Sequence, residues 1–255
     1  MSGTPLYVPP SALDPVERAL TYPYPAPDHD FVYRDGTAMP VAAIGAAERR
    51  GRLPVLAIGS NRAPAQLQRK FADMPEAEIA VERVRLAGFD VVHSAHLSGY
   101  AALAATLHPA PGVTVDISIT WLPPALMARM HATEGVGTFY DFVSLEGVAV
   151  RARDGTVVTD GAFAYVCRLG ALDFGDGPRG LAAVAASGRP YPALDQIAAQ
   201  QALAAMLGHA GMLPDFVRAN AADPGLRLAR EEALAPRRLA FAHPAARAAR
   251  AAPPA

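Results

Sequence analysis

Most of the region between residues 53 and 167 consists of strand-like segments, and two short helical segments, at residues 64–71 and 124–134, interrupt them. The strand-like segments are apolar and are bounded by glycine, proline or aspartate, which is typical of β-strands. They lie at residues 54–58, 79–86, 89–96, 101–107, 113–122, 139–150 and 156–167. Asp154-Gly155, between the last two, favours a hairpin turn. This order predicts an α+β fold on a compact mixed sheet or an open barrel.

The two ends of the chain differ from this central region. Residues 1–40 hold 8 of the 24 prolines and 4 of the 8 tyrosines, which disfavours long helices and predicts an extended, Pro/Tyr-rich arm that wraps the rest. Residues 192–207 predict a helix that ends at Gly208, and residues 235–255 are mostly Ala, Arg and Pro. We therefore expect an N-terminal arm, a central domain and a C-terminal part that is helical and then Ala/Arg-rich, at residues 1–50, 51–210 and 211–255.

The charge balance limits the kinds of partner that the chain binds. The 23 basic and 24 acidic side chains give a net charge of −1, which argues against bulk electrostatic binding to nucleic acid or to an anionic membrane. Cys167 is the only cysteine, so an internal disulfide and a multi-cysteine zinc site are excluded. We find no secretory signal and no apolar run of the roughly 18 residues that span a bilayer, which predicts a cytoplasmic protein.

A helix is predicted at residues 124–134, closed by Gly135. Leu126, Met130 and Glu134 are spaced by four residues and share one helix face, so the two apolar side chains direct the carboxyl group toward the core. Burial and the negative end of the helix dipole both disfavour the charged carboxylate there. A carboxyl group that holds its proton near neutral pH suits general acid–base catalysis. The alternative is that Glu134 lies in solvent at a frayed helix end.

The first predicted strand runs into the sequence Ile58-Gly59-Ser60-Asn61-Arg62-Ala63. A strand end, a glycine and the start of a helix leave backbone N–H groups free in one small volume. Such groups bind carboxylates and oxyanions without a lysine, which matters because Lys70 is the only lysine. An ordinary strand-to-helix turn is the alternative. Ser60 is not predicted to be a nucleophile, because the G-x-S-x-G pattern is absent.

Two further features are expected to be structural. His93 and His96 have a spacing that resembles a metal site, but residues three apart in a strand face opposite sides, so no metal site is predicted. We expect one of these histidines to face the core and the other to be exposed. Cys167, in an apolar strand, is expected to be a small buried side chain.

Two motifs in order resemble those of the γ-glutamylcyclotransferase-like superfamily. Leu-Ala-Ile-Gly-Ser-Asn-Arg at residues 56–62 is similar to the Tyr-Gly-Ser-Asn that follows the first strand of that family. Ala-Thr-Glu-Gly-Val-Gly-Thr-Phe-Tyr at residues 132–140 is similar to the family's Glu-Gly and later tyrosine after a short helix. Residues 164–166 and 187–191 resemble the next strand and the entry into the late helix. The resemblance covers roughly residues 53–208.

The resemblance implies a mixed β-barrel or sheet with a few flanking helices and one pocket. The family converts a γ-glutamyl amide into 5-oxoproline and a free amine by attack of the substrate's own α-amine on its γ-carbonyl, so no cofactor and no metal are implied. Glu134 would be the general base and then the acid for the leaving amine. The residues implied to bind the small-molecule γ-glutamyl substrate are Ile58, Gly59, Ser60, Asn61, Arg62, Ala63, Tyr140 and Tyr165.

The sequence departs from the family's pattern at two positions. Ile58 replaces a tyrosine, and His131 replaces an aspartate that usually lies three residues before the acidic residue. Three functions therefore stay open: an enzyme that releases 5-oxoproline, a catalytically inactive protein of the same fold that binds a small carboxylate, and an amide hydrolase. The leaving amine and the oligomeric state are not predicted.

Overall fold

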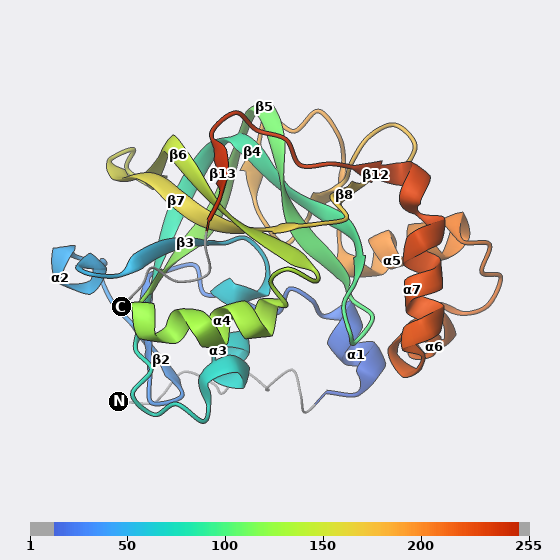
Figure 1. Ribbon diagram of the computed structural model, residues 1–255, viewed down its shortest axis with the longest axis horizontal. Helices are drawn as coiled ribbons and strands as arrows, with labels where there is room; N and C mark the ends of the chain where they lie inside the picture. Colours follow the sequence, from blue (N-terminus) through green and yellow to red (C-terminus); the bar gives the residue numbers. More distant parts are fainter. Residues whose placement is uncertain (1–12, 250–255) are drawn as a thin grey trace.

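A closed barrel of five strands forms the centre of the protein, as the computed structural model, which describes residues 13–249, shows (Figure 1). Its strands are β3 (Leu53–Ala57), β4 (Ile79–Leu97), β5 (Leu103–Leu122), β6 (Tyr140–Ala152) and β7 (Val157–Cys167). Neighbours pair in the order β5-β3-β7-β6-β4, and β4 pairs again with β5 to close the ring. The β3–β7 pair is parallel and the other pairs are antiparallel. The predicted α+β fold with a mixed barrel is confirmed.

Short strands extend this sheet on several sides. The β1–β2 hairpin pairs with β4 through β1, β13 pairs with β6, and β10 pairs with β5. Two further strands, β8 and β9, also pair with β4; β12 pairs with β8, and β11 pairs with β9. These additional strands are β1 (Phe31–Arg34), β2 (Thr37–Pro40), β8 (Ala171–Leu172), β9 (Gly180–Leu181), β10 (Ala186–Ser187), β11 (Ala193–Leu194), β12 (Arg238–Leu239) and β13 (Ala246–Ala248).

The two longest strands, β4 and β5, each replace two predicted ones. The predicted break between residues 86 and 89 is wrong, because Gly88 adopts a positive φ of 82° inside a register shift and the pairing with β5 resumes at Phe89. An irregularity of this kind bends a strand without ending it. The segments at 101–107 and 113–122 likewise join in β5. Both long strands therefore reach from one end of the barrel to the other.

Helices surround the barrel on two sides. Helices α3 and α4 lie below it in the view of Figure 1, and α5, α6 and α7 gather on its right. The α-helices are α1 (Pro15–Leu20), α2 (Ala46–Arg49), α3 (Pro64–Phe71), α4 (Met127–Glu134), α5 (Gln196–Met206), α6 (Leu213–Ala222) and α7 (Pro224–Ala233), and the 3₁₀ turns are η2 (Ser60–Arg62), η3 (Pro124–Leu126) and η4 (Ala235–Arg237). Within residues 13–249, no helix has both the length and the apolar character that crossing a membrane requires.

Three clusters of buried apolar side chains fill the barrel and hold the helices against it. The largest fills the barrel and includes Ile117 and Ile119, both inaccessible to solvent. The second holds α3 and α4 against the barrel through Leu67 and Met130. The third, which includes Phe216, lies between the ends of β4 and β5 and helices α5 and α6. Each fully buried side chain of this size stabilises the fold by about 1.5–3 kcal/mol.

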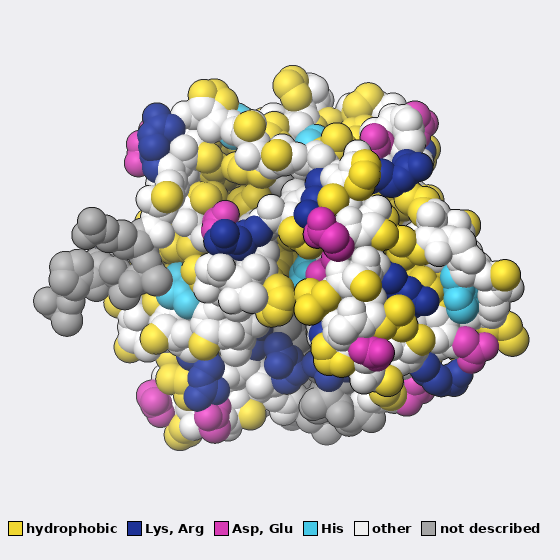
Figure 2. Space-filling model, turned by 45° about the vertical axis from the view of Figure 1, so that its right-hand side comes forward, with side chains coloured by type: hydrophobic (Ala, Val, Ile, Leu, Met, Phe, Trp, Pro, Cys, Tyr) yellow, Lys and Arg dark blue, Asp and Glu magenta, His cyan; other side chains and the backbone are white. Residues whose placement is uncertain are grey.

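The aromatic residues of the N-terminal arm pack as predicted. Tyr22, Tyr24 and Tyr33 are buried, while Tyr7 and the end of the predicted Ala/Arg-rich tail lie outside the described residues. On the face that Figure 2 presents, positive and negative side chains are interspersed, in keeping with the net charge of −1. Cys167 is buried, which confirms its expected structural role.

Candidate functional site

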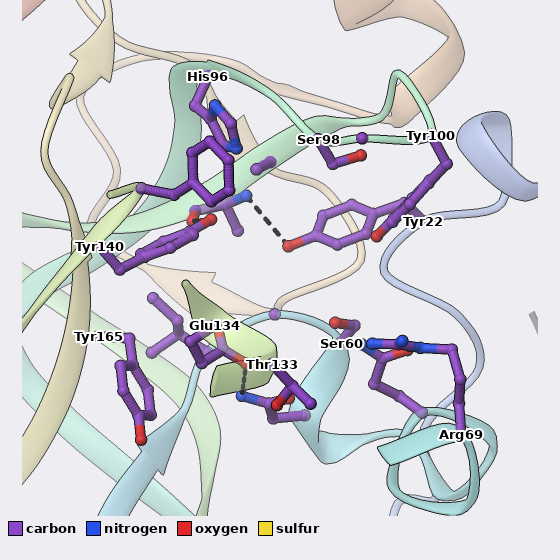
Figure 3. Close-up of a pocket in the computed structure, with 18 of the residues that line it drawn as sticks. Tyr22, Ser60, Arg69, His96, Ser98, Tyr100, Thr133, Glu134, Tyr140 and Tyr165 are labelled. Carbon is purple, nitrogen blue, oxygen red and sulfur yellow. Dashed lines mark hydrogen bonds between the residues drawn. The ribbon is translucent and has the colours of Figure 1, made fainter. Parts of the chain in front are cut away.

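A cavity of about 260 Å³ lies at one end of the barrel (Figure 3). Its wall comes from the C-terminal ends of β3, β4 and β7, the N-terminal ends of β5 and β6, the last turn of α4 and the residues around α1. Polar and apolar side chains both face it. Its size is near the lower limit of pockets for small ligands, so it suits a molecule of amino-acid or dipeptide size.

Glu134 reaches this cavity from the end of α4. Leu126 and Met130 are buried on the same helix face, as predicted. Their packing directs the side chain of Glu134, four residues after Met130, toward the cavity. Gly135 ends the helix in the left-handed conformation, with a φ of 62°. The Glu134 side chain is 15 % exposed, because one side of it borders the cavity and the other side packs against α3.

Two donors hold the Glu134 carboxylate. The amide Nδ2 of Asn61 donates to its Oε1 at 3.0 Å, and the ammonium of Lys70, on α3, donates to the same oxygen. Lys70 is 1 % exposed, so burial lowers the pKa of its ammonium, and the Glu134 carboxylate counteracts part of that shift. Both contacts join Glu134 to residues far away in the chain, and they give the carboxylate a cation and an amide donor that its position at the end of a buried helix does not predict.

The loop between β3 and α3 forms the wall beside Glu134. Ile58, Gly59, Ser60 and Asn61 all line the cavity. Among the described residues, the amides of Gly59 and Ser60 have no hydrogen-bond acceptor, and both precede the first intrahelical bond of η2. The loop therefore places two residues whose N–H groups have no acceptor among the described residues on the same cavity wall as the carboxylate.

The other two predicted loop residues do not line the cavity. Arg62 is buried, and its guanidinium donates to the carbonyl of Ala183. Burial lowers the pKa of Arg62 to about 10. Ala63 is inaccessible and begins α3 at its N-cap. Both side chains lie on the side of the loop that faces away from the cavity, where they hold the loop in place.

Tyr140 and Tyr165 both line the cavity, and protein groups satisfy their hydroxyls. The Tyr140 hydroxyl donates to the carbonyl of Ala105 at 3.3 Å. The Tyr165 hydroxyl lies 3.0 Å from Nδ1 of His131 and points away from the cavity in Figure 3. Burial lowers the pKa of His131, so its neutral ring accepts this hydrogen bond. The two tyrosines therefore offer ring surface to a ligand.

The arm adds a third tyrosine that the sequence argument did not place in the site. The backbone N–H of Ala105 donates to the hydroxyl of Tyr22 at 3.1 Å, which leaves the hydroxyl proton free to donate to a ligand. A Cβ atom at Gly59 would lie 2.5 Å from this hydroxyl oxygen. Glycine is therefore required at 59 so that the arm can close over the loop.

Replacement of Tyr22 by phenylalanine tests this packing. We expect the free energy of unfolding to fall by about 1–3 kcal/mol, because the buried N–H of Ala105 loses its acceptor. Urea unfolding, followed by the fluorescence of the single tryptophan, Trp121, measures the loss. Tyr33→Phe is the matched control: Tyr33 is equally buried in the arm, but its hydroxyl has no partner among the described residues. An equal loss in both variants would contradict the assigned hydrogen bond.

Two arginines and a histidine in the cavity were not predicted either. Arg18 lies over the ring of Tyr100 at 4.2 Å from its centroid, and Arg69 extends from α3. Neither has a carboxylate within 4.0 Å among the described residues. His96 faces the cavity from β4.

The expectation that either His93 or His96 is exposed is wrong, since both are buried. The alternation of β4 is interrupted between His93 and Leu97, and α7 covers His96. Across residues 13–249, no group of three or more His, Cys, Asp or Glu side chains is arranged to hold a metal ion.

No protein-family model matches the chain, and no curated protein matches it. Among solved structures, an uncharacterized human protein is 14 % identical with a TM-score of 0.38, and the match covers 67 % of this chain and 88 % of that one. A γ-glutamyl cyclotransferase is 15 % identical with a TM-score of 0.36, over 66 % of this chain and 86 % of that one.

Proposed function

We propose that this protein cyclises the γ-glutamyl group of a small γ-glutamyl amine or amino acid and releases 5-oxoproline and the amine. The observation that carries the proposal is the placement of the Glu134 carboxylate and the free amides of Gly59 and Ser60 on one small cavity. The protein would be a transferase or lyase of the γ-glutamylcyclotransferase-like type that needs no cofactor. A cytoplasmic location belongs to the same proposal, because the only cysteine is a buried thiol.

In this proposal the cavity folds the substrate into the conformation for attack. The α-ammonium binds at the Glu134 carboxylate, and the γ-carbonyl oxygen accepts hydrogen bonds from the amides of Gly59 and Ser60. The substrate carboxylate faces Arg18 and Arg69, which have no acidic partner of their own. Holding the two ends of one molecule in this way makes ring closure effectively intramolecular and pre-oriented.

The reaction changes the charge at two positions of the substrate, the α-nitrogen and the γ-carbonyl oxygen. Glu134 takes a proton from the α-ammonium, and the freed amine forms the bond to the γ-carbon. Negative charge develops on the carbonyl oxygen, where the two fixed amides stabilise it without reorganising. The attack closes the five-membered ring. The leaving nitrogen then takes up a proton, and collapse of the intermediate breaks its bond to the γ-carbon and releases the free amine.

The test is 5-oxoproline release from a panel of γ-glutamyl amines and amino acids. We expect Glu134→Gln to lower kcat by at least about 100-fold, because it removes the general base but keeps the shape of the side chain. Glu146→Gln is the matched control, since Glu146 is an exposed glutamate on β6 outside this cavity.

Two results would overturn the proposal. Equal turnover by Glu134→Gln and the unaltered protein would remove Glu134 from its role. Absence of turnover across the panel, together with a rise in Tm on adding a γ-glutamyl compound, would identify a binding protein in place of an enzyme.

A further inference from the structure

A buried glutamate from the C-terminal part of the chain holds a histidine in the cavity. Oε1 of Glu231, on α7, lies 2.8 Å from Nδ1 of His96 and accepts the backbone N–H of Leu97 at 2.7 Å. Both side chains are 7 % exposed. A carboxylate at Nδ1 fixes the proton there and leaves the other ring nitrogen, Nε2, for a separate task.

The neighbouring rings fix the orientation of His96. It stacks on Phe139 with centroids 4.8 Å apart and meets the edge of Tyr140 at 6.2 Å. Nε2 has no hydrogen-bond partner among the described residues, although His96 lines the cavity. Figure 3 shows His96 and Glu134 on opposite sides of that cavity. A ligand between them would have one titratable group on each side.

The two groups differ in what already holds them. The Glu134 carboxylate receives hydrogen bonds from Lys70 and Asn61 and is placed to bind the α-ammonium, whereas Nε2 of His96 has no partner among the described residues on the other side of the cavity. In the tetrahedral intermediate the leaving nitrogen is an amine, and it needs a proton before its bond to carbon breaks. An imidazolium held by a carboxylate at its other nitrogen supplies such a proton.

We infer that His96, held by Glu231, is a second catalytic residue that protonates the leaving amine from the side of the cavity opposite Glu134. This inference rests on the proposed function. The bond between the α-nitrogen and the γ-carbon forms, and the bond between the γ-carbon and the leaving nitrogen breaks. The α-nitrogen loses one proton to Glu134 and one to solvent, while the leaving nitrogen gains one from His96 and one from solvent. Solvent then restores both side chains.

Isosteric substrates with leaving amines of graded basicity test the assignment. We use γ-glutamyl ethylamide, 2-fluoroethylamide and 2,2,2-trifluoroethylamide, whose leaving amines differ little in size but become progressively less basic. We expect His96→Gln to lower kcat for the ethylamide by about 10²–10⁴-fold, and the loss to shrink steadily along the series. His29→Gln, at an exposed histidine outside the cavity, is the matched control.

The same series separates the two proposals. Turnover by the unaltered protein with an equal loss in His96→Gln for all three amides refutes the role of His96 and leaves the proposed function standing. No turnover of any γ-glutamyl compound refutes the proposed function and this role with it. A loss for Glu134→Gln that does not depend on the leaving amine supports the division of work between the two residues.

Glu231 acts as a positioning residue, and the same amide series tests it. We expect Glu231→Gln to lower kcat most for the ethylamide and least for the trifluoroethylamide, because His96 loses the carboxylate that holds the proton on Nδ1 and orients Nε2. An equal loss for all three amides would overturn the role of Glu231, whether or not the variant is less stable.

Discussion

Arg189→Met is expected to lower the free energy of unfolding by about 3–5 kcal/mol, because it leaves the carboxylate of Asp90 buried without a cation. Asp90 lies in β4 and is inaccessible to solvent. Its Oδ2 accepts from Nε of Arg189 at 2.7 Å and its Oδ1 from Nη2 at 2.8 Å. The guanidinium also donates to the carbonyl of Val184 at 2.9 Å. One arginine thus joins β4 to the loop that follows β9.

The surrounding chain is built around this ion pair. A Cβ atom at Gly180 would lie 2.6 Å from Nε of Arg189, so only glycine allows the guanidinium to pass. The Oδ1 atom of Asp90 also accepts the backbone N–H of Val91 at 2.7 Å. Because these contacts satisfy the charges of both side chains, removing one partner costs far more than the pair itself contributes.

Urea unfolding of three variants measures this effect. Arg218→Met is the matched control, since Arg218 pairs with Asp215 at 3.4 Å with both side chains more than 60 % exposed, and exposed pairs contribute about 0–1 kcal/mol. Asp90→Asn combined with Arg189→Met is expected to recover part of the loss, because no buried charge remains. Equal losses for Arg189→Met and Arg218→Met would contradict the buried pair.

The parts of the site that the sequence predicted depend on short-range patterns. The spacing of Leu126, Met130 and Glu134 places a carboxylate on an apolar helix face, and Gly135 ends that helix in the left-handed conformation. The end of a strand at Gly59 gives free amides in the same way. Each pattern lies within about ten consecutive residues, so the local conformation can be predicted from that short stretch of sequence. The resemblance to a known family then indicated that the two segments belong to one pocket.

The parts that it missed depend on partners far apart in the chain. Lys70 contacts Glu134 across 64 residues, Tyr22 contacts Ala105 across 83, and Glu231 contacts His96 across 135. No spacing or composition rule identifies such pairs, because barrel closure and the packing of α7 bring them together. Lys70 stood out in the sequence only as the sole lysine. Its ammonium is the cation that contacts Glu134, a partner that the spacing along the helix does not reveal.

Lys70→Met is expected to lower the free energy of unfolding by about 3 kcal/mol, near the lower end for breaking a buried ion pair. The lower value follows because the Glu134 side chain borders the cavity and is 15 % exposed, whereas Lys70 is 1 % exposed. Methionine keeps the length of the side chain and its contact with the apolar group that includes Met130, so the loss measures the missing charge. The same variant is expected to turn over γ-glutamyl substrates more slowly, because the carboxylate loses the partner that holds its position.

A double-mutant cycle separates this charge effect from packing. In Lys70→Met combined with Glu134→Gln no ionised group remains at the pair, so we expect most of the stability to return and a coupling energy of at least about 1 kcal/mol. Arg69→Met is the control on the same helix, since Arg69 donates to the neutral side chain of Gln66 and its removal leaves no unpaired carboxylate. Additive losses in the double variant would mean that the two side chains are not energetically coupled. In that case the ammonium of Lys70 would not be what holds the Glu134 carboxylate in place at the cavity.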